Sequence, residues 1–222
     1  MRFRLRLGRW WQFSKDYRKV PIVLIDGEQF NDSSAIIDEI ERRIAAANPA
    51  AAKAGGGWFG KTGTSGKAAP AEEVAARRKW VDDHLVHLLP PNIYLTPAEA
   101  LRSFEYVTEV GNFGTFARYA AKYTGAAAMY AISGKLKKKY GIVNEREELY
   151  AAADDFANAV GDDRPFHGGD APDLADMAVF GVLRAIQLIG ADTWQDLQAH
   201  SRIGPWFARM QAAAPSARVA AD

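Results

Sequence analysis

Asp32 and Ser33 are the residues best suited to hold a charged ligand, because they stand where an apolar-periodic helix is expected to begin. A helix N-terminus offers unpaired backbone N–H groups and the positive end of the helix dipole, and both favour a carboxylate. The side chain of Asp32 can at the same time pair with an ammonium group. The two residues therefore predict a site for an amino acid that carries both charges.

A second element of this site is the Val20–Pro21 step, which opens a β-branched run. If this peptide bond is cis, the N–H and C=O of Val20 point into the cleft and can pair with the backbone of a bound peptide. Asp26-Gly27 then predicts a tight hairpin that returns the chain to Asp32 and Ser33. These elements together predict half of a binding site for a small thiol peptide, with the γ-glutamyl end of glutathione at Asp32 and Ser33.

The other candidate motifs are weaker. Residues 55–62 match the phosphate-binding pattern Gly-x4-Gly-Lys-Thr, but an Ala-rich segment precedes them, and the pattern needs a strand there. His84 and His87 lie one helical turn apart, and the spacing indicates no third metal ligand. His167 is followed by two glycines and is expected to shape a turn. The lysines at 135 and 137–139 are expected to close a helix in solvent, with contact to anionic lipid as the alternative.

The composition restricts the classes of function. The chain has 222 residues, 48% of them hydrophobic, which is enough for a substantial core. A net charge of +1 argues against nucleic acid as the main partner. The chain contains no cysteine, so its own residues supply neither a disulfide nor a thiol nucleophile. No apolar run reaches the roughly 18–20 residues that span a bilayer. The arginine-rich start, residues 1–13, is expected to form a solvated arm or a strand, with a transit segment or use at a membrane surface as the alternative.

The pattern along the chain predicts an α+β fold with four regions. Residues 1–47 are expected to form a partial α/β unit, 48–72 a flexible Ala/Gly-rich linker, 73–215 an all-α domain and 216–222 a tail. A first helix is expected to stop at Pro90-Pro91. Capping boxes at Thr96–Glu99 and Asp173–Asp176 begin later helices. The helices are expected near 96–111, 115–140, 144–160, 173–189, 193–200 and 204–213.

Five ordered segments resemble the membrane-associated type 2 prostaglandin E synthases, a branch of the glutathione transferase superfamily. They are Tyr-Arg-Lys-Val-Pro-Ile at 17–22, Asn-Asp-Ser-Ser-Ala-Ile-Ile at 31–37, Trp-Val-Asp-Asp-His-Leu-Val-His-Leu at 80–88, Lys-Tyr-Thr-Gly-Ala-Ala-Ala-Met-Tyr at 122–130 and Arg-Pro-Phe-His-Gly-Gly-Asp-Ala-Pro-Asp-Leu-Ala-Asp at 164–176. The resemblance covers most of the chain from 17 to about 209. It implies a truncated thioredoxin-like unit followed by an all-α transferase-like domain.

The resemblance also implies an activity, the isomerisation of the lipid endoperoxide prostaglandin H2 to prostaglandin E2. It implies glutathione as cofactor, with Val20 and Pro21 at its cysteinyl backbone and Asp32 and Ser33 at its γ-glutamyl group, and haem as a possible second cofactor. A homodimer, peripheral membrane association, and a cytoplasmic or organellar location are implied as well.

The chain departs from this family at its start. The family begins with a strand, a helix and a strand that carry a Cys-x-x-Cys-type motif, whereas only sixteen residues precede Tyr17 and none is cysteine. Three explanations are open: an isomerase that uses bound glutathione alone, a non-catalytic binding or interaction protein, and a sequence whose upstream residues carry the missing unit.

Overall fold

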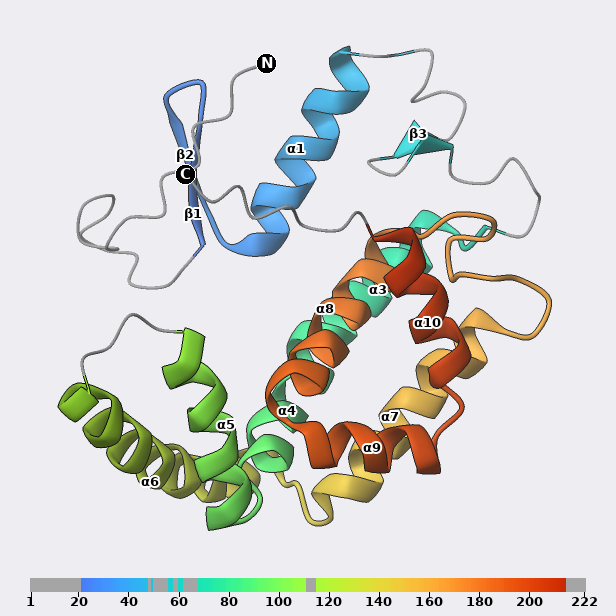
Figure 1. The fold of residues 1–222 in the computed structure, drawn as a ribbon. Coiled ribbons are helices and arrows are strands. Elements are labelled where there is room, and N and C mark those ends of the chain that lie inside the picture. Colours follow the sequence, from blue (N-terminus) through green and yellow to red (C-terminus); the bar gives the residue numbers. More distant parts are fainter. Residues whose placement is uncertain are drawn as a thin grey trace. The chain divides into compact units, whose positions relative to one another are not determined.

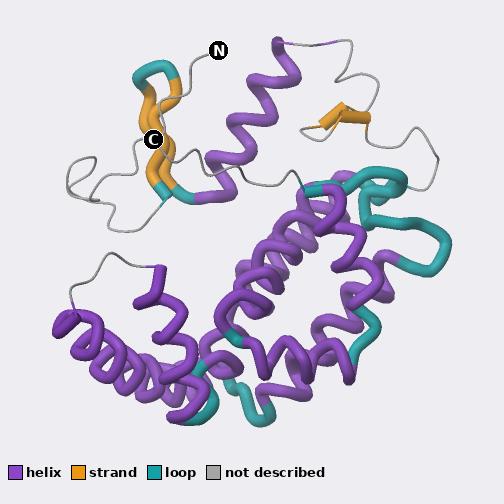
Figure 2. Tube along the Cα trace, in the orientation of Figure 1, coloured by secondary structure: helices purple, strands orange, loops and turns teal. Residues whose placement is uncertain are grey.

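The computed structural model describes residues 21–47, 49, 56–57, 60–61, 68–110 and 115–214, and within helices the side chains of 106–110, 115 and 117 are not described. The chain divides into two compact units, residues 1–64 and 65–222, and each is described by itself. Figure 1 shows the elements along the chain, and Figure 2 colours helices, strands and loops in the same orientation.

The first unit contains the predicted hairpin and helix. Strand β1 (Ile22–Ile25) pairs antiparallel with β2 (Glu28–Asn31), and Ile22 lies opposite Asn31. The turn between them has positive φ at Asp26 and Gly27, 52° and 90°, as a two-residue hairpin of this twist requires. Helix α1 (Ser33–Ala47) follows β2 directly.

A small apolar cluster joins the hairpin to α1. The buried side chains of Val23, Ile25 and Ile36 form it, and Phe30 and Ile40 pack against it partly buried. Ile36 and Ile40 are four residues apart and so lie on one face of the helix. This packing fixes the start of α1 against the hairpin, which is what the predicted site needs.

The second unit is a bundle of helices around α8, as Figure 1 shows. Helices α3, α4, α5, α9 and α10 all contact α8, and α6 packs against α5 and α4. The bounds are α3 (Ala71–Trp80), a π-helical turn η2 (Val81–Leu85), α4 (Val86–Ile93), α5 (Pro97–Val110), α6 (Thr115–Tyr140), α7 (Glu145–Val160), α8 (Leu174–Ile189), α9 (Ala191–His200) and α10 (Gly204–Ala213).

The core of this unit is aromatic at its centre. The ring of Phe156 meets that of Trp206 edge-on at 5.0 Å between centroids, and Trp194 packs on Phe207 at 4.3 Å. Leu149, Leu183, Ile186 and Leu197 are fully buried around them. Rings in edge-on contact stabilise a core beyond their buried area alone.

The helix positions expected in the second unit agree with the structure, with two corrections. Pro90 and Pro91 lie inside α4, which ends at Ile93, so the prediction that they stop the helix was wrong. The two prolines remove two backbone donors from the helix, and it ends two residues after Pro91. The first helix also begins at Ala71, two residues before the predicted boundary at 73.

The predictions on the linker and on the ends of the chain fall mostly outside the described residues. Within 48–72, the structure gives a short antiparallel pair, β3 (Gly56–Gly57) and β4 (Gly60–Lys61), besides the approach to α3. The possible strand at 1–13 and the tail at 216–222 lie outside the described residues. The four-region division stays a prediction.

Candidate functional site

Asp32 occupies the N-cap of α1. Its side-chain Oδ1 accepts hydrogen bonds from the N–H of Ser34 at 2.9 Å and of Ala35 at 3.4 Å. Its carbonyl oxygen accepts the first intrahelical bond, from the N–H of Ile36, at 3.0 Å. A capped and packed helix end holds its remaining donors in a fixed direction, so a ligand binding there meets groups that are already ordered.

The hairpin register brings two of the four predicted site residues to one end of the sheet. Because Ile22 pairs with Asn31, their outward neighbours Pro21 and Asp32 both stand at the open end of the hairpin. Pro21, Asp32 and Ser33 are exposed to solvent. Val20 lies outside the described residues, so its predicted backbone contact stays a prediction.

The backbone of Asp32 carries a feature that sequence reasoning missed. Its φ is +76°, in the left-handed region that a side chain other than glycine seldom adopts. Aspartate and asparagine tolerate this region best, and residues held in it cluster at ligand-binding sites. An Asp directly after a strand and directly before a helix is a weak signal for such a conformation. The geometry turns the chain sharply from β2 into α1 and leaves Asp32 and Ser33 facing solvent.

A second cluster of chemistry-bearing residues surrounds Asp176, which is fully buried in the first turn of α8. Its carboxylate accepts bonds from the N–H groups of His167, Gly168 and Asp173, each at 3.0 Å, and from Trp206 Nε1 at 2.8 Å. The predicted capping box with Asp173 is confirmed. The additional donors from the 164–170 loop and α10 show that Asp176 joins three segments, which the sequence pattern alone did not indicate.

His167 is enclosed in the same cluster. Its Nδ1 lies 2.6 Å from Asp173 Oδ2 and its Nε2 lies 3.2 Å from Glu73 Oε1, in the first turn of α3. Burial disfavours the charged ring, but the hydrogen bond and charge of Asp173, with the charges of Asp176 and Glu73, outweigh burial and raise the pKa of His167. Phe166 and Gly169 exchange backbone hydrogen bonds around it, so the predicted turn is confirmed.

This arrangement predicts a pH dependence of stability. Since the pKa of His167 is raised above its unfolded value near 6.5, its contribution is fully present below that pH and is lost as pH rises through the folded pKa. We expect the urea midpoint to fall between pH 6 and pH 9 by more in the native chain than in His167→Gln. The exposed His200→Gln serves as control and should leave the pH dependence as it is. Equal slopes for native chain and His167→Gln would contradict the assignment.

The two other histidines singled out by spacing do not form a metal site. His87 stacks on Tyr140, with ring centroids 3.8 Å apart, and burial lowers the pKa of His87. His84 lies against Trp80. Among the residues that the structure describes, no group of three or more His, Asp or Glu side chains is placed to hold a metal ion.

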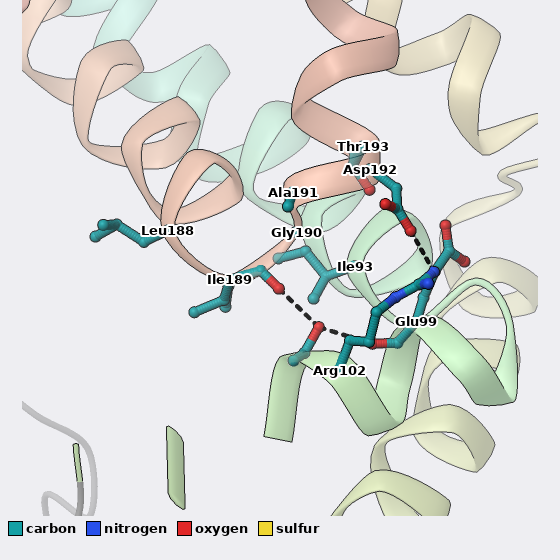
Figure 3. Close-up of a pocket in the computed structure, with 10 residues that line it drawn as sticks. Ile93, Glu99, Arg102, Leu188, Ile189, Gly190, Ala191, Asp192 and Thr193 are labelled. Atoms are coloured by element: carbon teal, nitrogen blue, oxygen red, sulfur yellow. Dashed lines mark hydrogen bonds and ion pairs between the residues drawn. The ribbon is translucent and has the colours of Figure 1, made fainter. Parts of the chain in front are cut away.

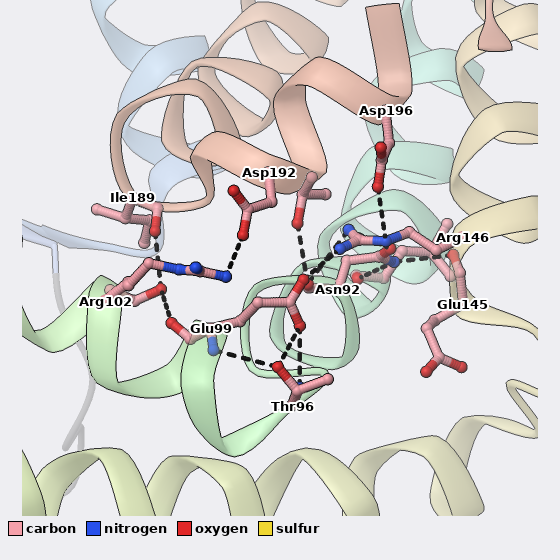
Figure 4. Close-up of polar contacts among 12 residues, drawn as sticks. Asn92, Thr96, Glu99, Arg102, Glu145, Arg146, Ile189, Asp192 and Asp196 are labelled. Carbon is pink, nitrogen blue, oxygen red and sulfur yellow. Dashed lines mark hydrogen bonds and ion pairs between the residues drawn. The ribbon is translucent and has the colours of Figure 1, made fainter. Parts of the chain in front are cut away.

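A cavity of about 150 Å³ lies between α5 and the junction of α8 with α9 (Figure 3). The polar groups that line it bond to one another. Arg102 pairs with Asp192, and Ser103 Oγ donates to the carbonyl of Ile189 at 2.8 Å. Figure 4 shows the adjoining network, in which Arg146 Nη2 contacts Glu99 Oε1 at 2.6 Å. Because these polar groups already have protein partners, the region is a structural junction of helices.

The predicted capping box at the start of α5 belongs to the same junction. Thr96 N–H donates to Glu99 Oε2 at 2.9 Å, and Glu99 N–H donates to Thr96 Oγ1 at 3.1 Å. The buried Asn92 donates from Nδ2 to the carbonyls of Leu88 and Glu145, each at 2.8 Å. Glu145 in turn pairs with Lys137, so this lysine of the basic cluster serves a helix contact.

No helix in the described ranges of the chain is long and apolar enough to cross a membrane.

No protein-family model matches the chain. The chain is 42% identical to prostaglandin E synthase 2 of Mus musculus over 229 aligned residues, which cover 89% of this chain and 59% of the mouse protein. It is 38% identical to prostaglandin E synthase 2 of Danio rerio over 226 residues, again 89% of this chain and 59% of that protein. The chain thus spans less than two thirds of the length of these relatives. It is a homologue of prostaglandin E synthase 2 over most of its own length.

Proposed function

We propose that this chain acts as a prostaglandin E synthase, isomerising prostaglandin H2 to prostaglandin E2 with glutathione as the thiol cofactor. The observation that carries the proposal is the solvent-facing start of α1, with Asp32 and Ser33 exposed there. The sequence similarity supports it, because the two relatives are named prostaglandin E synthase 2. The proposal includes the transferase-like architecture, with a truncated thioredoxin-like unit before an all-α domain.

Each proposed site residue has one task. The carboxylate of Asp32 pairs with the ammonium group of the γ-glutamyl residue, and Oδ1 keeps its bond to the N–H of Ser34 meanwhile. The hydroxyl and N–H of Ser33 bind the α-carboxylate at the positive end of α1. Val20, held by Pro21, pairs through its backbone with the cysteinyl residue.

The described residues fit one half of glutathione. A zwitterionic amino-acid group needs an anion and hydrogen-bond donors side by side. Asp32 supplies the anion and Ser33 the donors, since the N–H groups of Ser34 and Ala35 are bonded to Asp32 Oδ1. When bound, glutathione would supply a thiolate for attack on one endoperoxide oxygen, so that an S–O bond forms as the O–O bond breaks and the other oxygen takes up a proton. Removal of the proton from the carbon that bears the S–O oxygen would then form the ketone and release the thiolate. The 222 residues contain no cysteine, so glutathione is the thiol source that the residues of this chain can bind.

Haem remains what the resemblance implies, and no described residue of the second unit is assigned as its axial ligand. Two cavities of that unit, of about 150 and 290 Å³, have no histidine in their linings, and Tyr94 and Tyr130 line the larger one. Both ring nitrogens of His167 are engaged, with Asp173 and Glu73. The proposal therefore rests on glutathione alone.

The test is product formation by the purified chain. With prostaglandin H2 and glutathione, we expect prostaglandin E2 to form faster than in buffer with glutathione alone, as measured by mass spectrometry. S-methylglutathione, which keeps the γ-glutamyl group but has no free thiol, should not support the reaction and should inhibit it competitively. A rate equal to that of the protein-free control would contradict the catalytic proposal. Saturable glutathione binding without turnover would instead favour the non-catalytic binding protein, which the absence of cysteine supports.

A further inference from the structure

The chain enters the helical unit through residues 68–73, which we call the entry segment. Two contacts hold this segment on the loop before α8. Ala68 lies against Gly169, since a Cβ added at Gly169 would be 3.4 Å from the backbone of Ala68. Glu73, in the first turn of α3, lies with its Oε1 3.2 Å from His167 Nε2. Figure 1 shows α3 beside α8, to which it packs.

The ring of His167 is closed off from solvent between two carboxylates that are exposed to different degrees. The side chain of His167 is 0% exposed, that of Asp173 is 9% exposed and that of Glu73 is 41% exposed. The Nδ1 atom lies 2.6 Å from Asp173 Oδ2. Phe156 of α7 stacks on the ring, with the centroids 5.8 Å apart. The two carboxylates are therefore the hydrogen-bond partners of the two ring nitrogens.

This arrangement fixes the number of protons on the ring. A neutral imidazole has one N–H and one lone pair, whereas an imidazolium has two N–H groups. An ionised carboxylate only accepts hydrogen bonds. A neutral ring in this position would therefore set its lone pair against one of the two anions, and the doubly protonated ring satisfies both contacts.

The charges around the ring favour the same state. The titratable and charged groups of the surrounding elements are Glu73 and Arg77 of α3, Asp155 of α7, Asp163, Arg164 and Asp170 of the loop, Asp173 and Asp176 of α8, and Arg209 of α10. Arg77 pairs with Asp155, whereas Arg164 and Arg209 donate to backbone carbonyls at 2.6 and 2.8 Å. Burial favours the neutral ring, but the facing carboxylates outweigh it and raise the pKa of His167.

The two contacts are unequal, so the ring gives up one proton before the other. Asp173 is held in place, because its Oδ1 accepts from the N–H groups of Ala175 and Asp176 at 2.8 and 2.9 Å. The contact of Nε2 with Glu73 is longer, and its carboxylate is partly in solvent. Nε2 therefore loses its proton first, after which its lone pair and the Glu73 carboxylate repel each other. Glu73 can turn into water, whereas Asp173 cannot leave without uncapping α8.

We propose that His167 and Glu73 form a pH-dependent clamp that holds the entry segment while both ring nitrogens are protonated and releases it when Nε2 loses its proton. Because the folded pKa lies above the ordinary value of about 6.5, the clamp is closed below that pH and opens as pH rises through the folded pKa. The cap of α8 stays in place through Asp173. The entry segment leads from the unit that carries Asp32 and Ser33, so the clamp makes the attachment of that unit depend on pH.

Ring-nitrogen NMR of the histidine-labelled chain tests the order of proton loss. We expect both nitrogens of His167 to be protonated at pH 6, and Nε2 to lose its proton first as pH rises. Glu73→Gln removes one of the facing charges and should lower the titration midpoint by about half a pH unit. Glu72→Gln, an exposed neighbour on α3, is the matched control and should leave the midpoint unchanged. An unchanged midpoint in Glu73→Gln, or loss of the Nδ1 proton first, would overturn the proposal.

Amide hydrogen exchange tests the release itself. The N–H of Val74 donates to the carbonyl of Pro70 at 3.1 Å, so its protection reports the first turn of α3, and Met177 reports the α8 start in the same way. Between pH 6 and pH 8, corrected for intrinsic rates, protection of Val74 should fall about fivefold more than that of Met177. Glu73→Gln should abolish this difference, since its amide can accept from Nε2 or donate to it. Equal changes at Val74 and Met177 in the native chain would show a general loss of stability and no clamp.

Discussion

Asp176→Ala is expected to lower the free energy of unfolding by about 3–5 kcal/mol. The carboxylate accepts four hydrogen bonds at a fully buried position, from three backbone N–H groups and the indole of Trp206. Alanine leaves these donors without an acceptor, and each unsatisfied buried donor costs about 1–3 kcal/mol before the structure relaxes. Because the donors come from the 164–170 loop, the α8 start and α10, all three contacts are lost together.

Chemical denaturation followed by circular dichroism measures this effect. Asp170→Ala, in the same loop but exposed, is the matched control and should change stability by less than about 0.5 kcal/mol. Asp176→Asn should fall between the two, since its amide keeps one oxygen acceptor but turns an NH2 group toward the donors. If Asp176→Ala were as stable as the control, the network would not hold the second unit together.

Asp32→Asn is expected to weaken glutathione binding about tenfold, which corresponds to about 1.4 kcal/mol. Asparagine is as good an N-cap as aspartate, and it tolerates a positive φ equally well. The substitution therefore keeps the α1 start and removes only the negative charge that pairs with the γ-glutamyl ammonium. A hydrogen bond to a charged group contributes about 1.5–3 kcal/mol, and solvent exposure places the expected loss at the lower end.

Isothermal titration calorimetry with glutathione measures the two affinities. Asp38→Asn makes the same change of charge on α1, at an exposed position beyond its first turn, and should leave the affinity unchanged. A loss of affinity equal in both variants would show a general effect of net charge. An unchanged affinity in Asp32→Asn would rule out the role of Asp32 as ammonium partner.

Much of the helical unit could be predicted from local signals. The capping boxes at Thr96 and Asp173 marked the starts of α5 and α8, because a cap depends on residues within one turn. The prediction from Pro90-Pro91 was wrong because a local signal gives the helix end only approximately: α4 runs two residues past Pro91 before it ends at Ile93. The tertiary partners of Asp176 and His167 lay beyond prediction, because they come from distant segments that only packing brings together.

The elements that carry the candidate site were predictable, but their geometry was not. The order Val20-Pro21, hairpin, Asp32-Ser33 is readable because each step is a local signal, and the structure confirms the hairpin and the helix start. The positive φ of Asp32 was not readable, since Asp also caps helices from ordinary extended backbone.

The most direct test of the central claim is a titration of the isotope-labelled chain with glutathione, followed by the backbone amide signals of the α1 start. The account predicts saturable shifts concentrated at Asp32, Ser33 and Ser34, with the same residues shifting less in Asp32→Asn at equal ligand concentration. Saturable shifts confined to the helical unit, or no saturable shift anywhere, would contradict the claim that this chain carries the γ-glutamyl half of a glutathione site.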